Sequence, residues 1–279
     1  MREYAHLHPL SNVRFYLKMK LCFSTLGCFD RELERIISLA NEYSIPAIEI
    51  RGIGGILDNT QISVFSEENA DATISLLASG NVTPIVLGTS CSFHNPEKYE
   101  RAISEGVAAI KIAERLNIPN IRVFGDKMTE GSTERIISGI SELCSSSDSV
   151  NVLLEVHGDY NTLEALTPIT ERLSSLKSFG IIWDIEHTHK TYGDRWEEFY
   201  SALRPYIKHV HIKDYSDSKG CLTLIGDGSV AIVPIVRGLI KNGYDGYFSL
   251  EWEKKWHPEL PDIEEALESF IKIMKEAEA

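Results

Sequence analysis

The sequence predicts a single (β/α)8 barrel, an α/β fold in which eight parallel strands alternate with helices. Short apolar runs alternate with longer amphipathic segments from about residue 20 to the C-terminus. Eight such strand–helix units follow one another at a spacing of roughly 30 residues, and eight is the number that a closed barrel requires. No Gly-x-Gly-x-x-Gly motif follows the first strand, which disfavours a doubly wound open sheet.

Each expected strand is a short and mostly apolar run. In chain order the strands are 21–24, 47–51, 84–88, 121–125, 152–157, 180–184, 209–214 and 247–251. The expected helices carry apolar residues along one side, at the spacing of an α-helix. They span 30–43, 67–79, 96–116, 133–144, 162–174, 196–203, 230–241 and 263–277. The third of these begins at Pro96, which suits a first turn because that turn needs no N–H from it.

Composition and charge exclude several classes of partner. The chain has 279 residues, 43% of them hydrophobic, and a formal net charge of -13. A negative field of this size repels phosphate polymers and anionic membranes, so we expect neither nucleic acid nor a membrane as a partner. No apolar run approaches the ~20 residues of a membrane span. A homo-oligomer is left open.

The cysteines indicate the cellular compartment, and the N-terminal residues show no sign of a secretion signal. Five scattered cysteines without a Cys-x-x-Cys pair suit reduced thiols in a cytoplasm. Residues 1–18 mix charged, aromatic and proline residues without periodicity, and they lack the apolar core of a signal peptide. We therefore expect them to form an arm outside the barrel, which would occupy residues 19–279.

Four consecutive expected strands end in side chains that bind metals. They are Glu155, Asp184, His211 and Glu251. In a (β/α)8 barrel the carboxyl ends of the strands form the active-site face, so these four side chains should meet. Partly buried carboxylates need a shared cation, and three carboxylates with one imidazole suit one Mn²⁺, Mg²⁺ or Co²⁺ ion, with Zn²⁺ as a further option. The alternative is a buried ion-pair network without metal, but the sequence suggests no matching set of cations there.

Four motifs on these strands resemble those of one known superfamily. They are Leu154-Glu155, Asp184-Ile-Glu-His187, His211-Ile-Lys-Asp214 and Gly246-Tyr-Phe-Ser-Leu-Glu251, and Gly226 and Gly228 resemble its glycine loop. The chain is similar to the xylose-isomerase-like barrels, which include ketose 3-epimerases, inosose dehydratases and endonuclease IV. The resemblance implies that the four strand-end residues are the metal ligands. It also implies that Glu155 and Glu251 are the catalytic acid–base pair.

Further side chains are expected around the metal site. His187 matches a position that contacts substrate oxygen in the similar barrels, and Lys213 could neutralise an oxyanion or a phosphate. Glu49 and Arg51, which end the second strand, could hold the far end of a polyol, and Trp183 could form an apolar wall. His209 lies deeper in its strand than His211, so we expect a hydrogen-bonded interior group rather than a ligand.

These residues favour a metal-dependent isomerase or epimerase acting on a sugar or sugar phosphate. A metal-stabilised enediolate would let the glutamates remove and return a proton beside a carbonyl. The first alternative is a dehydratase of the inosose or dehydroshikimate type, which shares that proton abstraction. An endonuclease-IV-like phosphodiesterase is a weaker alternative, because Leu222–Gly228 lacks the histidine that such enzymes carry there. The last alternative is a barrel that binds a carbohydrate or a partner without catalysing a reaction.

Overall fold

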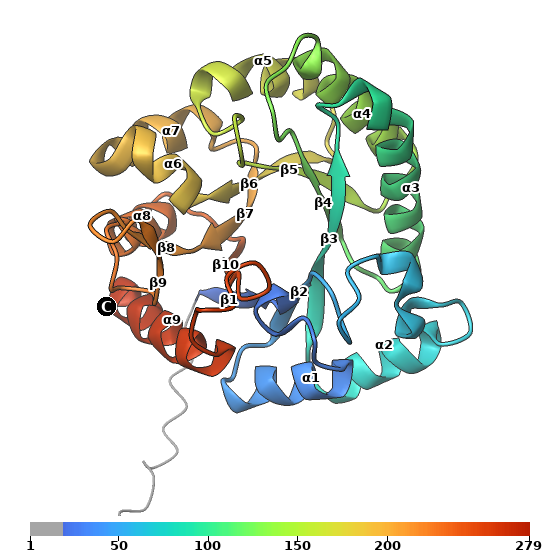
Figure 1. Cartoon of the computed structure of the whole chain (residues 1–279), viewed down its shortest axis with the longest axis horizontal. Helices are drawn as coiled ribbons and strands as arrows, with labels where there is room; N and C mark the ends of the chain where they lie inside the picture. Colours follow the sequence, from blue (N-terminus) through green and yellow to red (C-terminus); the bar gives the residue numbers. More distant parts are fainter. Residues whose placement is uncertain (1–18) are drawn as a thin grey trace, which may run out of the picture.

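The computed structural model describes residues 19–279 and confirms the expected (β/α)8 barrel, with eight parallel strands enclosed by a ring of helices (Figure 1). The arm expected at residues 1–18 lies outside the described residues. The barrel strands are β1 (Lys20–Ser24), β2 (Ala47–Ile50), β3 (Thr83–Ser92), β4 (Asn120–Phe124), β5 (Asn151–Glu155), β6 (Phe179–Asp184), β7 (Ile207–Ile212) and β10 (Tyr247–Leu250).

The strands follow chain order around the barrel, and β1 closes it by pairing with both β2 and β10. The helices of the outer ring are α1 (Leu33–Glu42), α2 (Ala70–Ser79), α3 (Tyr99–Arg115), α4 (Ser132–Ser145), α5 (Leu163–Leu173), α6 (Ile185–Tyr192), α7 (Trp196–Leu203), α8 (Ile232–Lys241) and α9 (Ile263–Glu278). Their apolar faces pack against the outer faces of the strands in one continuous core.

The barrel interior changes from apolar to polar along the strands. A separate apolar cluster, which includes Ala47, Leu153 and Ile182, fills the interior near the strands' amino ends. Two residues further along the same strands lie Glu49, Glu155 and Asp184, which therefore face the same interior. The apolar cluster fills the barrel toward the amino ends of the strands, and the polar groups lie toward their carboxyl ends.

The structure differs from the prediction in two segments after barrel strands. Residues 185–192, expected as a loop, form α6, which begins where Asp184 accepts hydrogen bonds from the N–H groups of Glu186 and His187. The run of polar residues in this helix hides the apolar periodicity that would have predicted it. A short hairpin of β8 (Asp214–Ser216) and β9 (Cys221–Thr223) follows β7.

Asp214 organises the loop that leads from this hairpin to α8. Its carboxylate accepts hydrogen bonds from the backbone N–H groups of Tyr215, Gly226, Gly228 and Val230, at 2.8–3.2 Å. A Cβ atom on Gly228 would lie 2.1 Å from the Asp214 carboxylate, so only glycine permits this approach. The expected glycine loop is thus held by one side chain.

We expect Asp214→Ala to lower the free energy of unfolding by about 3 kcal/mol, because four backbone N–H donors, one buried and three part-buried, lose their shared acceptor. Urea unfolding of the variant measures this loss. Asp227→Ala, an exposed aspartate in the same loop, is the matched control and should change stability by less than about 0.5 kcal/mol. Equal stability of the two variants would contradict the assigned role of Asp214.

Within residues 19–279, none of the helices combines the length and apolar character that a membrane span needs. All five cysteines lie in this range and are free thiols; four are buried and Cys221 is exposed.

Candidate metal and substrate site

The four predicted metal-binding side chains meet at the carboxyl end of the barrel. One ligand atom from each of Glu155, Asp184, His211 and Glu251 lies within 4.8 Å of the others, and all four residues are buried. The strand register explains this meeting, because Asp184 on β6 pairs with His211 on β7, and β10 runs beside β7 and leads directly into Glu251. Whether the group holds a metal stays a prediction.

Glu49 fixes the orientation of His211. Its Oε2 atom accepts hydrogen bonds from Nε2 of His211 at 2.9 Å and from Nε2 of His209 at 3.1 Å. Burial alone would raise the pKa of Glu49, but the two imidazoles hold that pKa below its ordinary value. Since an ionised carboxylate only accepts, both Nε2 atoms carry the proton, and Nδ1 of His211 turns toward the other carboxylates.

Glu49 was expected to hold the far end of a polyol, and this expectation is wrong. Its side chain is fully buried beneath His211, and it does not line the cavity described below. His209 is the hydrogen-bonded interior group that the sequence suggested.

Lys213 is a buried cation among the candidate ligands. Its Nζ atom lies 2.9 Å from Oδ2 of Asp184 and 2.8 Å from Oε2 of Glu251, and it also pairs with Glu253. Burial opposes its charge, but Asp184 and Glu251 raise the pKa of Lys213 well above its ordinary value. In return, Lys213 lowers the pKa of both carboxyls against the effect of their burial. Its role as a substrate contact stays a prediction.

Arg122 on β4 is a second buried cation, and the sequence reasoning missed it. Its Nη1 atom lies 3.1 Å from Oε2 of Glu155 and 3.2 Å from Oε1 of Glu251, so one nitrogen joins the two predicted catalytic glutamates. Its guanidinium also lies over the ring of Phe124, 4.5 Å from the centroid. Burial opposes the charge of Arg122, but Glu155 and Glu251 hold its pKa above the ordinary value.

The sequence suggested no set of cations to match the carboxylates, but Arg122 joins Lys213 at this end of the barrel. Their two permanent charges nevertheless face four buried carboxylates, those of Glu49, Glu155, Asp184 and Glu251. Among the described residues, Nδ1 of His211 has no hydrogen-bond partner, although it lies 3.4 Å from Oε2 of Glu251 and 3.6 Å from Oε1 of Glu155.

An orphaned imidazole nitrogen beside an excess of carboxylates fits a divalent cation. The donor set of three carboxylates and one imidazole is chemically suited to Mn²⁺, Mg²⁺, Co²⁺ or Zn²⁺.

A cavity of about 290 Å³ opens beside this cluster, a volume near the lower end for small-molecule sites. Glu155, Glu251 and Arg122 line it on the side of the cluster, and Arg51 lines it as well. The loop after β10 adds Trp256, whose residue surface is 53% exposed. An exposed tryptophan at a cavity suits contact with the C–H face of a sugar. The sequence offers no period-two signal for Trp256, because it lies in a loop.

The remaining predicted residues divide between the site and the core. His187, on α6, lies 3.8 Å from Asp184 and packs edge-on against His157, which lines the cavity. Burial lowers the pKa of His187, which favours the neutral imidazole. Trp183 was expected to wall the site but is fully buried in the outer layer, where it stacks on Tyr200 and donates to Thr188. It precedes inward-facing Asp184 by one residue, so its side chain points outward.

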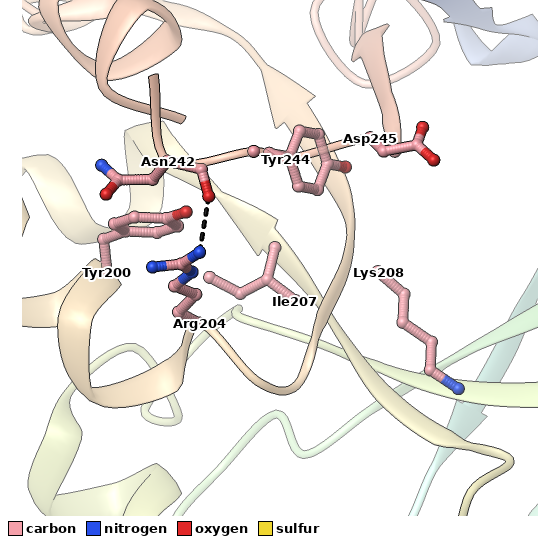
Figure 2. Close-up of a pocket in the computed structure, with 9 residues that line it drawn as sticks. Tyr200, Arg204, Ile207, Lys208, Asn242, Tyr244 and Asp245 are labelled. Atoms are coloured by element: carbon pink, nitrogen blue, oxygen red, sulfur yellow. Dashed lines mark hydrogen bonds between the residues drawn. The ribbon is translucent and has the colours of Figure 1, made fainter. Parts of the chain in front are cut away.

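A second cavity, of about 270 Å³, lies at the opposite end of the barrel (Figure 2). It is formed where β7 and β10 begin, and Arg204 donates there to the carbonyl of Asn242 at 2.5 Å. Its single carboxylate, Asp245, is exposed and paired with Lys20. Its described lining therefore lacks the group of carboxylates and histidines that marks the carboxyl end.

Comparison with known proteins places this geometry in a family. A family model described as xylose isomerase-like TIM barrel matches residues 37–273. The chain belongs to the xylose isomerase-like TIM barrel family. This membership confirms the resemblance seen in the four sequence motifs.

Among the proteins that this chain is similar to, the printed names give more than one reaction. An inosose dehydratase of Clostridium perfringens is 25% identical over 169 residues, which are 53% of this chain and 54% of that protein. The chain thus matches only about half the length of this curated relative. The solved IOLI protein with a bound zinc atom superposes with a TM-score of 0.74 at 19% identity, covering 93% of this chain and 98% of that one. D-psicose 3-epimerase of Clostridium cellulolyticum H10, solved with D-tagatose, gives a TM-score of 0.71 at 15% identity, covering 91% and 98%.

Proposed function

We propose that the chain is a divalent-metal-dependent isomerase or epimerase that moves a proton beside the carbonyl of a sugar or sugar phosphate. The observation that carries this proposal is the pair Glu155 and Glu251, two carboxylates that contact the same nitrogen of Arg122 and line one cavity. Their position beside the metal-ligand group supports it, as does the fold that the chain shares with D-psicose 3-epimerase.

The residues of the chain supply binding and proton transfer. Asp184, His211, Glu155 and Glu251 would hold the metal, which as a Lewis acid stabilises negative charge on substrate oxygens. Nη1 of Arg122 contacts both glutamates and holds them at one wall of the cavity, and an ionised carboxylate there could accept a proton. One glutamate would take the proton from the carbon beside the carbonyl, and the other would return a proton to the opposite face of that carbon. Return to the neighbouring carbon would instead interconvert an aldose and a ketose.

A dehydratase is the second candidate, and the curated relatives favour it. Inosose dehydratases of Clostridium perfringens and Lacticaseibacillus casei match this chain at 24–25% identity. A dehydratase would begin with the same proton abstraction by a glutamate. The β-hydroxyl would then leave with a proton as water, and a carbon–carbon double bond would form beside the carbonyl. Nucleic acid is not proposed as a substrate, because the net charge of -13 opposes it.

One assay separates these reactions. The metal-loaded protein is incubated in deuterium oxide with ketoses, ketose phosphates and inososes, and each mixture is followed by proton NMR and ultraviolet absorbance. An isomerase or epimerase exchanges the proton beside the carbonyl for deuterium without forming an enone band. A dehydratase produces that band and loses a hydroxyl group. The proposal would be contradicted if no compound in the pool showed either proton exchange or an enone band.

A further inference from the structure

Arg51 is a buried guanidinium that forms no ion pair within the described part of the chain. It follows β2, and only 6% of its surface is exposed. Its Nη2 atom donates to Oγ of Ser90 at 2.8 Å and its Nη1 atom to the carbonyl of Leu57 at 3.3 Å, and both acceptors are neutral. Among residues 19–279, no carboxylate oxygen lies within 4.0 Å of its nitrogens, whereas Arg122 and Lys213 each contact two or more carboxylates. A buried cation without a counter-charge is unfavourable.

A second positive charge lies beside Arg51 instead of a negative one. A Cβ atom on Gly88 of β3 would meet Cδ of Arg51 at 2.8 Å and Nη2 of Arg122 at 3.4 Å, so both arginines pass over this glycine. Burial, and then the charge of Arg122, lower the pKa of Arg51 to about 10. Glu105, Glu155 and Glu251 oppose this lowering from a distance. Arg122 is in direct contact with Glu155 and Glu251, whereas Arg51 forms no ion pair within the described residues.

Arg51 also faces space that a ligand can enter. It lines the cavity of about 290 Å³ together with Ser90, Ser92 and His157. Nδ1 of His157 and Nε of Arg122 are buried and have no hydrogen-bond partner within the described part of the chain. Hydroxyl, imidazole and guanidinium groups are all donors to an oxyanion.

The carboxylates near Arg51 are already engaged. Glu105 accepts a hydrogen bond from the N–H of Ser90 at 2.6 Å. Asp126 and Glu253 line the same cavity, but Asp126 lies 3.5 Å from His94 and Glu253 pairs with Lys213. None of these described carboxylates forms an ion pair with Arg51, so its guanidinium can pair with an anion from outside the chain.

We infer that Arg51 is the centre of an oxyanion subsite, which binds a carboxylate or phosphate group of the substrate. A guanidinium presents a planar pair of N–H donors that matches either group. The carbonyl end of the substrate then lies toward Glu155 and Glu251, and the oxyanion lies at the far side of the cavity. The substrate class becomes an anionic polyol ketone rather than a neutral ketose. Calling the ligand a substrate rests on the proposed function, whereas anion binding does not depend on turnover.

Isothermal titration of the full chain with three related ligands tests this subsite. Glycerol is neutral, glycerate adds a carboxylate, and glycerol 3-phosphate adds a phosphate to a similar skeleton. We expect at least one of the two anions to bind about 10- to 100-fold more tightly than glycerol, and the tighter of the two identifies the group recognised. The preference should persist after treatment with EDTA, because it depends on Arg51 and not on a metal.

Substitutions of Arg51 locate the binding. Arg51→Met should remove the preference for the anion, while Arg51→Lys should keep part of it. Arg101→Met, at an exposed arginine on α3, makes the same change in net charge and should retain the full preference. Equal affinity of the wild type for glycerol and both anions would overturn the subsite, as would an unchanged preference in Arg51→Met. Anion binding without proton exchange on any ketone would contradict the proposed function and leave the subsite standing.

Discussion

Glu155→Gln and Glu251→Gln are each expected to lower the rate of proton exchange beside the carbonyl by about 10²- to 10⁴-fold. An amide cannot accept the proton that the ionised carboxylate removes. Both glutamates are buried, line the cavity and contact Nη1 of Arg122, so neither can replace the other without a rearrangement of this cluster. The measurement is the initial rate of deuterium incorporation at saturating metal and substrate.

Glu164→Gln is the matched control for this first prediction, because it removes the same charge from an exposed residue on α5. This control should exchange protons at the wild-type rate. Bound metal must be measured in all variants, since Glu155 and Glu251 also belong to the candidate ligand group. A rate within about threefold of the wild type in both cavity variants would show that proton transfer uses other groups.

Glu49→Gln is expected to weaken binding of the divalent metal by about 10- to 100-fold, although Glu49 is not itself one of the four candidate ligands. The carboxylate of Glu49 keeps the proton of His211 on Nε2, which leaves Nδ1 free for the metal. Glutamine presents a neutral oxygen or an N–H donor to the same imidazole, so it no longer fixes that tautomer. Competition with EDTA, followed by metal analysis, gives the affinity.

A positioning role for Glu49 has a signature that a direct catalytic role lacks. Excess metal should restore most of the exchange rate in Glu49→Gln, whereas it should restore none in Glu155→Gln and Glu251→Gln. The far-ultraviolet circular dichroism of the variant should match that of the wild type. Unchanged metal affinity in a folded Glu49→Gln protein would show that His211 needs no such support.

Much of this site follows from the period of two in the strands. The sequence locates Glu155, Asp184 and His211 because each sits at or near the carboxyl end of an expected strand with its side chain toward the interior. The same period directs Trp183 toward the outer layer, so its burial there could have been predicted from the inward direction of its neighbour Asp184. The position of Arg122 could also have been predicted, because it lies between Ile121 and Val123 on β4. When these two apolar residues face the helices, the charged residue between them faces the interior.

The depth of a side chain within the barrel and its partners from distant strands are harder to predict from the sequence. Glu49 has the expected inward direction, but the stagger of the strands sets it beneath His211, next to Ser24 of β1 in the register. The stagger depends on closure of all eight strands and not on any single segment. The contact of Arg51 with Ser90 spans 39 residues, and the absence of an ion pair to Arg51 within residues 19–279 depends on several loops at once. Such properties emerge only in the folded chain.

The most direct test of the central claim is a titration of the EDTA-treated full chain with Mn²⁺, followed by the electron paramagnetic resonance signal of the free ion. The four-residue group at the carboxyl end of the barrel predicts one tightly bound Mn²⁺ per chain, which His211→Ala should abolish without unfolding the protein. Endonuclease IV, one of the barrels that the motifs resemble, has three metals, so three tightly bound ions per chain would instead favour a phosphodiesterase of that kind. The absence of tight binding in the wild type, or equal binding in His211→Ala, would contradict the assignment of this cluster as a metal site.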